Sequence, residues 1–242
     1  MTATRGVTDG LYLGEVVLLV LGVVLFAVLI VAFVYQLRRQ RSLKSLIAFF
    51  LVSIVMIVYP SIRSIQYKDG AITLEKMTRE LNENPTDVKL REALDEKIKD
   101  VAPRVANSPK DAVKLARAQF DLGREDEAAR SLERVPPSNA DLPEVRELRT
   151  HIDQVDRLRS LANKVEANPG DQQSRGELQR TLAAADQVKW ANPNALAVVS
   201  KAQSALGEHT KAEAAIEKAI RIAPNNPKIR RQRDSLVRNA QP

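Results

Sequence analysis

The chain has 242 residues, with 37 Lys and Arg against 30 Asp and Glu, so its formal charge is +7; this length allows one or two domains. The absence of cysteine excludes disulfides, thiolate metal sites and cysteine nucleophiles, and two histidines, His151 and His209, leave little for a metal site or a histidine relay. Aromatic residues make up only 4% of the chain, which argues against an aromatic-rich β-sandwich or barrel.

Two long stretches near the N-terminus carry no charge. Residues 16–37 form the first, and at about 1.5 Å per residue they give roughly 33 Å of helix, enough to cross a bilayer. Residues 45–62 form the second, roughly 27 Å long, and Pro60 lies where that helix should stop. The first stretch is too long for a cleaved signal peptide; the alternative for the second is a buried or interfacial helix. We predict a membrane anchor over residues 1–63 with two transmembrane helices.

The segment between the two stretches is strongly basic. Four cations fall within seven residues, at Arg38, Arg39, Arg41 and Lys44. Because cytoplasmic loops are enriched in Lys and Arg, we predict that residues 38–44 are cytoplasmic. Residues 64–242 would then lie in the periplasm, with the anchor in a bacterial inner membrane. Arg63 and Lys68 favour the opposite orientation.

The residues after the anchor change in character. Residues 64–73 contain the turn signal Lys68-Asp69-Gly70, so we expect a tight linker or a short strand pair there. Beyond residue 59 the chain holds 32 Lys and Arg against 28 Asp and Glu. This near balance gives no signature of nucleic-acid binding.

An internal repeat organises the rest of the chain. Three pairs of prolines are each separated by 84 residues: Pro85 and Pro169, Pro109 and Pro193, Pro143 and Pro227. The same shift superposes Leu122-Gly123 on Leu206-Gly207 and, upstream, Leu74 on Leu158. Coincident Gly and Pro at a fixed offset indicate a repeat architecture.

Two units within this repeat resemble the tetratricopeptide repeat. Residues 193–226 carry the pattern in Leu196, Val199, Ser200, Gly207, Ala212, Ile216, Ala219 and Pro224. Residues 109–142 carry it more weakly, in Leu115, Ala116, Gly123, Ala128, Leu132 and Val135. The resemblance implies a solenoid of helical hairpins over residues 74–242, and with the two predicted transmembrane helices this gives an all-α fold. Gly123 and Gly207 should reverse the chain in the left-handed conformation.

The end of the solenoid needs a cover, because a terminal hairpin cannot bury its own apolar stripe. Residues 227–240 suit a capping helix whose Ile229, Leu236 and Val237 pack inward. Trp190 is expected to pack between hairpins.

Enzymatic chemistry finds no support in the motifs. The chain has no Gly-rich phosphate loop, zinc-ligand helix or nucleophile elbow, and its carboxylates alternate with Lys and Arg as on solvated helix faces. We therefore predict a non-catalytic protein without cofactor or metal.

The resemblance also implies a peptide-binding groove on the concave face. Its residues would be Lys110, Val113, Arg117, Phe120 and Asp121 in the first unit, and Asn194, Ala197, Lys201, Ser204 and Ala205 in the second. Three cations and an exposed Phe120 in this groove favour an acidic extended segment with an apolar anchor. The alternative is that the cations are merely solvated and the partner docks elsewhere. Ala197 and Lys201 depart from the family's clamp for chaperone C-terminal carboxylates.

The leading hypothesis is a membrane-anchored scaffold that binds a protein or peptide partner. The rival is an accessory subunit of a membrane enzyme, transport or biogenesis complex. Bacterial cytochrome c biogenesis factors are similar in topology, but residues 38–44 leave no room for their longer cytoplasmic loop. A self-assembling structural protein is a third reading, and the oligomeric state stays open.

Overall fold

A computed structural model describes residues 13–38, 44–103, 105 and 108–239. The chain divides into two compact units, one comprising residues up to 72 together with 101–108, the other residues 73–100 and those from 109 onward. The described residues form ten α-helices and no strand, which confirms the predicted all-α class.

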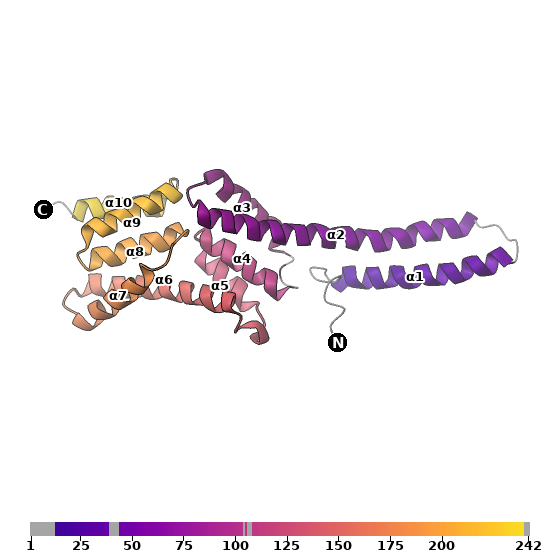
Figure 1. Cartoon of the computed structure of the whole chain (residues 1–242), viewed down its shortest axis with the longest axis horizontal. Coiled ribbons are helices and arrows are strands. Elements are labelled where there is room, and N and C mark those ends of the chain that lie inside the picture. The colour runs from indigo at the N-terminus through magenta and orange to yellow at the C-terminus, as the bar shows by residue number, and fades with distance from the viewer. Residues whose placement is uncertain (1–12, 39–43, 104, 106–107, 240–242) are drawn as a thin grey trace. The chain divides into compact units, whose positions relative to one another are not determined.

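The first unit contains two apolar helices that lie side by side (Figure 1). They are α1, Leu13–Arg38, and the first part of α2, Lys44–Glu83. Ser53 Oγ donates to the carbonyl of Gly22 at 2.8 Å, and the rings of Phe26 and Phe50 meet edge to face at 5.5 Å. Both helices are long and apolar enough to cross a membrane, and most of their large apolar side chains are exposed.

Helix α2 does not end where local signals predict. It continues through Pro60 and through the expected turn at residues 68–70, so the linker or strand pair expected at 64–73 is wrong. Ser61 Oγ donates to the carbonyl of Ile57 at 2.7 Å, close to the backbone hydrogen bond that Pro60 cannot make. Buried residues at 67, 71, 74, 78 and 81 keep the spacing of one helix face, and this burial outweighs the cost of Gly70. The basic loop predicted at 38–44 lies mostly outside the described residues.

The second unit is a series of antiparallel helical hairpins (Figure 1). After the end of α2 come α3 Val88–Val101, α4 Pro109–Asp121, α5 Glu125–Glu133, α6 Pro143–Ala167, α7 Gln172–Ala185, α8 Pro193–Ala205, α9 His209–Ile222 and α10 Pro227–Asn239. Several helices begin at the predicted Pro signals. At α8, Asn192 Oδ1 accepts from the amides of Asn194 and Ala195 at 2.8 and 3.0 Å, and Pro193 takes the first turn, where no amide is needed.

Both predicted glycine turns are confirmed. Gly123 has φ of 84° and Gly207 has φ of 85°. In the first turn the amide of Arg124 donates to Gln119 and that of Gly123 to Phe120, and the second turn repeats the arrangement. These paired bonds satisfy the last carbonyls of α4 and α8, and only glycine adopts the required conformation without strain.

Small residues bring the two helices of a hairpin close together. Ala116, Ala128 and Ala212 are fully buried, and Ser200 Oγ donates to the carbonyl of Ala212 at 2.7 Å. At the end of the series, α10 contacts α8 and α9 and buries Ile229 and Leu236. Val237, predicted to face inward, is 48% exposed, because it lies about 100° around the helix from its neighbour Leu236.

Candidate functional site

A groove of about 560 Å³ lies between three helices of the second unit. Its walls are one face each of α2 and α4 and the start of α6. They comprise Glu75, Thr78, Arg79 and Asn82; Lys110, Val113, Lys114 and Arg117; and Leu142, Glu144, Glu147 and Leu148. The first two sets recur at spacings of three or four residues, so each set shares one helix face. Three predicted groove residues, Lys110, Val113 and Arg117, therefore meet in one cavity.

Ion pairs cross this groove on both sides of α4. Lys114 Nζ lies 2.9 Å from Glu75 Oε2, and its hydrogen bond and charge lower the pKa of Glu75. Arg117 Nη1 donates to Glu147 Oε1 at 2.9 Å, and this hydrogen bond lowers the pKa of Glu147. Lys110 is exposed at the groove's edge. Lys114 and Arg117 of α4 therefore already face carboxylates of α2 and α6.

A buried polar cluster lies beneath Arg117. Asp121 is only 3% exposed; Asn82 Nδ2 donates to its Oδ2 at 2.8 Å, and Arg117 Nε lies 3.4 Å from the same oxygen. Burial raises the pKa of Asp121, while Arg117 and Asn82 oppose that rise. Burial also acts against the charge on Arg117, but Asp121 and Glu147 together outweigh it and raise the pKa of Arg117. The cluster links α2, α4 and α6, so the three walls are held together by satisfied polar groups.

An aromatic cluster corrects one prediction. Phe120, expected to be an exposed anchor in the groove, is 2% exposed. Its ring stacks on His151 at 6.3 Å, and His151 meets Trp190 edge to face at 5.4 Å. Trp190 is buried and donates from Nε1 to the carbonyl of Ala185 at 3.0 Å, as a packing residue. Burial, followed by the nearby charge of Arg117, lowers the pKa of His151.

The predicted residues of the second repeat unit do not line this groove. Asn194 Nδ2 donates to the carbonyl of Gly123 at 2.7 Å, so it holds a turn in place. Ala197 is buried, Lys201 Nζ lies 3.0 Å from Glu166 Oε2, and Ser204 is half-buried. The two predicted sets thus lie in different parts of the second unit.

Sequence reasoning missed the walls that α2 and α6 contribute. The missed charged residues are Glu75, Arg79, Glu144 and Glu147. A signal for α2 existed: the 84-residue shift superposes Leu74 on Leu158, which marks the last turns of α2 as the counterpart of a solenoid helix. The turn signal at residues 68–70 predicts a break in the helix and so conflicts with it.

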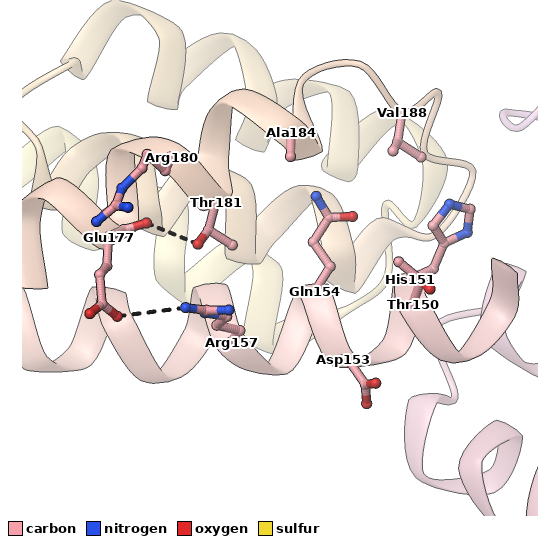
Figure 2. Close-up of a pocket in the computed structure, with 10 residues that line it drawn as sticks. All are labelled: Thr150, His151, Asp153, Gln154, Arg157, Glu177, Arg180, Thr181, Ala184 and Val188. Atoms are coloured by element: carbon pink, nitrogen blue, oxygen red, sulfur yellow. Dashed lines mark hydrogen bonds and ion pairs between the residues drawn. The ribbon is translucent and has the colours of Figure 1, made fainter. Parts of the chain in front are cut away.

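A second hollow, of about 690 Å³, lies between α6 and α7 (Figure 2). Several of its polar groups already have partners within α6 and α7. Thr150 Oγ1 donates to the carbonyl of Arg146 and Thr181 Oγ1 to that of Glu177, and Arg157 lies 3.7 Å from Glu177. Its two Arg and two acidic residues balance. Only His151 connects it with the predicted features, so the groove on α4 is the better candidate.

Comparison with known proteins supports the repeat predicted at residues 193–226, the unit that carries the tetratricopeptide pattern more completely. No curated protein and no solved structure matches the chain. Residues 193–226, which form α8, α9 and the turn after them, match the tetratricopeptide repeat family. The chain therefore carries a tetratricopeptide repeat, a module of protein–protein interaction.

Proposed function

We propose that the protein is a non-catalytic scaffold, anchored in a membrane by α1 and α2, that holds a partner protein on the helical hairpins of its second unit. The apolar length and exposed apolar side chains of both helices support the anchor. In water these two helices would expose an apolar surface far larger than the apolar patches that soluble monomers expose. The four cations at residues 38–44 support a cytoplasmic loop, and with it a periplasmic solenoid at a bacterial inner membrane.

We propose the groove between α2, α4 and α6 as the binding site, for an extended segment of the partner. The observation that carries this proposal is the convergence of three helices on one cavity that combines an apolar floor with charged walls. Val113 and Leu148 provide the floor, whereas Lys114 and Arg117 hold carboxylates at the rim. Exposed ion pairs contribute only about 0–1 kcal/mol each. A charged ligand can therefore replace these internal ion pairs with ion pairs of its own at little cost in free energy.

Site-specific photo-crosslinking of the full chain in its membrane tests the groove. A photoreactive amino acid at Lys110 should form an adduct with the partner, and Val113→Trp should abolish that adduct by filling the floor. The same photoreactive group at Arg130, an exposed residue of α5 outside the groove, is the control. Equal adducts at both positions, or an adduct that persists beside Trp at 113, would contradict the groove.

The orientation has its own test. A C-terminal reporter that is active only in the cytoplasm should stay silent if the solenoid is periplasmic. An active reporter would reverse the orientation and leave the groove proposal intact.

A further inference from the structure

The second half of the solenoid repeats the two helices that form the α4 and α6 walls of the groove, but not the acidic residues of the α6 wall. The 84-residue shift places α4 on α8 and the start of α6 on α10. The structure supports this correspondence, because Gln232 Nε2 donates to the carbonyl of Ala197 at 2.7 Å. Their counterparts, Leu148 and Val113, likewise line one cavity.

The charges of the two halves differ at the corresponding positions. In the first half Arg117 faces Glu147 at 2.9 Å. Their counterparts are Lys201 and Arg231, so a cation stands where the first half has its carboxylate. The counterpart of Glu144 is also a cation, Lys228.

Lys201 turns to another helix instead. Its Nζ lies 3.0 Å from Glu166 Oε2 on α6, and its side chain stays 33% exposed. Lys228 and Arg231 are exposed on α10, and within the described part of the chain neither forms an ion pair. Of the three cations at these corresponding positions, only Lys201 therefore has a carboxylate partner among the described residues, whereas in the first half Arg117 is paired with Glu147.

We infer that Lys201, Lys228 and Arg231 bind the side-chain carboxylates of an acidic, extended segment of a partner protein. The first half itself shows what fits there, since Glu147 places a carboxylate against Arg117 at the corresponding position. Charge complementarity selects the ligand. Because Lys228 and Arg231 replace Glu144 and Glu147, the second half lacks these internal carboxylates, and a carboxylate of the partner can take their role. The inference rests on the proposed scaffold function but not on the first groove.

Binding of a synthetic acidic peptide tests this inference. The full chain is placed in discs of zwitterionic phosphatidylcholine, and a labelled peptide of alternating Glu and Ala is followed by fluorescence anisotropy. A peptide with Gln in place of Glu is the matched ligand. The Glu peptide should bind more tightly than the Gln peptide, and rising salt should weaken it because exposed charges are screened.

Charge reversal locates the site. Lys228→Glu with Arg231→Glu should lower the affinity for the Glu peptide by about tenfold or more, because two exposed attractions become repulsions. Arg130→Glu with Arg134→Glu changes the net charge equally on exposed residues at the C-terminal end of α5 and should leave binding unchanged. Equal losses in both variants, no loss in the first, or equal affinity for both peptides would overturn the inference.

A lipid surface is the competing occupant. Acetylation of Lys228, measured by mass spectrometry without peptide, should proceed at the same rate in discs of phosphatidylcholine and of anionic phosphatidylglycerol. Slower acetylation on the anionic lipid would assign these cations to headgroups and overturn the inference. Peptide binding here with no adduct at Lys110 would refute the first groove alone, and the converse result would refute this inference alone.

Discussion

Two buried glutamines at corresponding positions of the two halves differ by one hydrogen bond. Gln119 Oε1 accepts from Ser131 Oγ at 2.7 Å. In the second half Ala215 stands at the position of that serine, and Gln203 Oε1 is buried without a hydrogen-bond partner among the described residues. Supplying the missing hydroxyl through Ala215→Ser should therefore stabilise the protein.

The magnitude follows from three contributions. An intramolecular hydrogen bond gives about 0.5–1.5 kcal/mol, and relieving a buried unsatisfied acceptor is worth about 1–3 kcal/mol. Serine costs roughly 0.5 kcal/mol relative to alanine inside a helix, and Ala215 is half-buried, so its hydroxyl keeps some competing hydration. We expect a net gain of about 1 kcal/mol. The converse change, Ser131→Ala, strands Gln119 and should cost about 1–3 kcal/mol.

Urea unfolding of the full chain in detergent measures both changes. Trp190, the single tryptophan, is buried in the same unit and reports on its unfolding. Ala214→Ser, on the exposed side of the same helix, is the control for serine propensity alone. If Ala215→Ser destabilises the protein as much as Ala214→Ser does, the reasoning about the unsatisfied oxygen is refuted.

Three further predictions concern the turns, the aromatic cluster and the apolar helices. Gly207→Ala should cost about 1–2 kcal/mol of unfolding free energy through its positive φ alone. Gly123→Ala should cost more, because a Cβ there would also lie 3.1 Å from Asn194 Nδ2. Equal losses of the two variants in urea unfolding would contradict this. Because the folded state lowers the pKa of His151, the unfolded chain binds its proton more readily, and stability should fall as pH drops below about 6.5. His151→Phe should flatten that slope, and an unchanged slope in melting curves would refute the assignment. Gly22→Leu should separate α1 from α2, since a Cβ there would lie 3.0 Å from Ile57 Cγ1 and Met56 Cβ; an unchanged melting temperature in detergent would exclude this contact.

The features that the sequence predicted correctly have local causes. A proline fixes φ and lacks an amide, so Pro193 marks the first turn of α8 wherever that helix packs. A reversal that needs positive φ selects glycine, which is why Gly123 and Gly207 were identified from their neighbours in sequence alone. The 84-residue repeat adds the hairpin order, because small and large residues recur at corresponding positions of the two repeat units.

Local signals failed where burial opposed them. Pro60 and Gly70 are helix-breaking residues in isolation, yet α2 passes through both. Ser61 supplies a hydrogen bond near Pro60, and one continuous buried face favours the helix across Gly70. The sequence shows the local penalty of each residue, whereas the compensating contacts come from elsewhere in the fold.

The site depends on tertiary structure even more strongly. Phe120 occupies a position that faces the groove in the family, but His151 and Trp190, from distant segments, cover it. Arg117 is a cation by sequence, but whether it is free depends on Glu147, thirty positions later, and on buried Asp121. Sequence alone therefore determined which residues can carry charge or turn the chain. Only the packing of helices decided which charges are already neutralised, because that depends on distances of a few ångströms between separate elements.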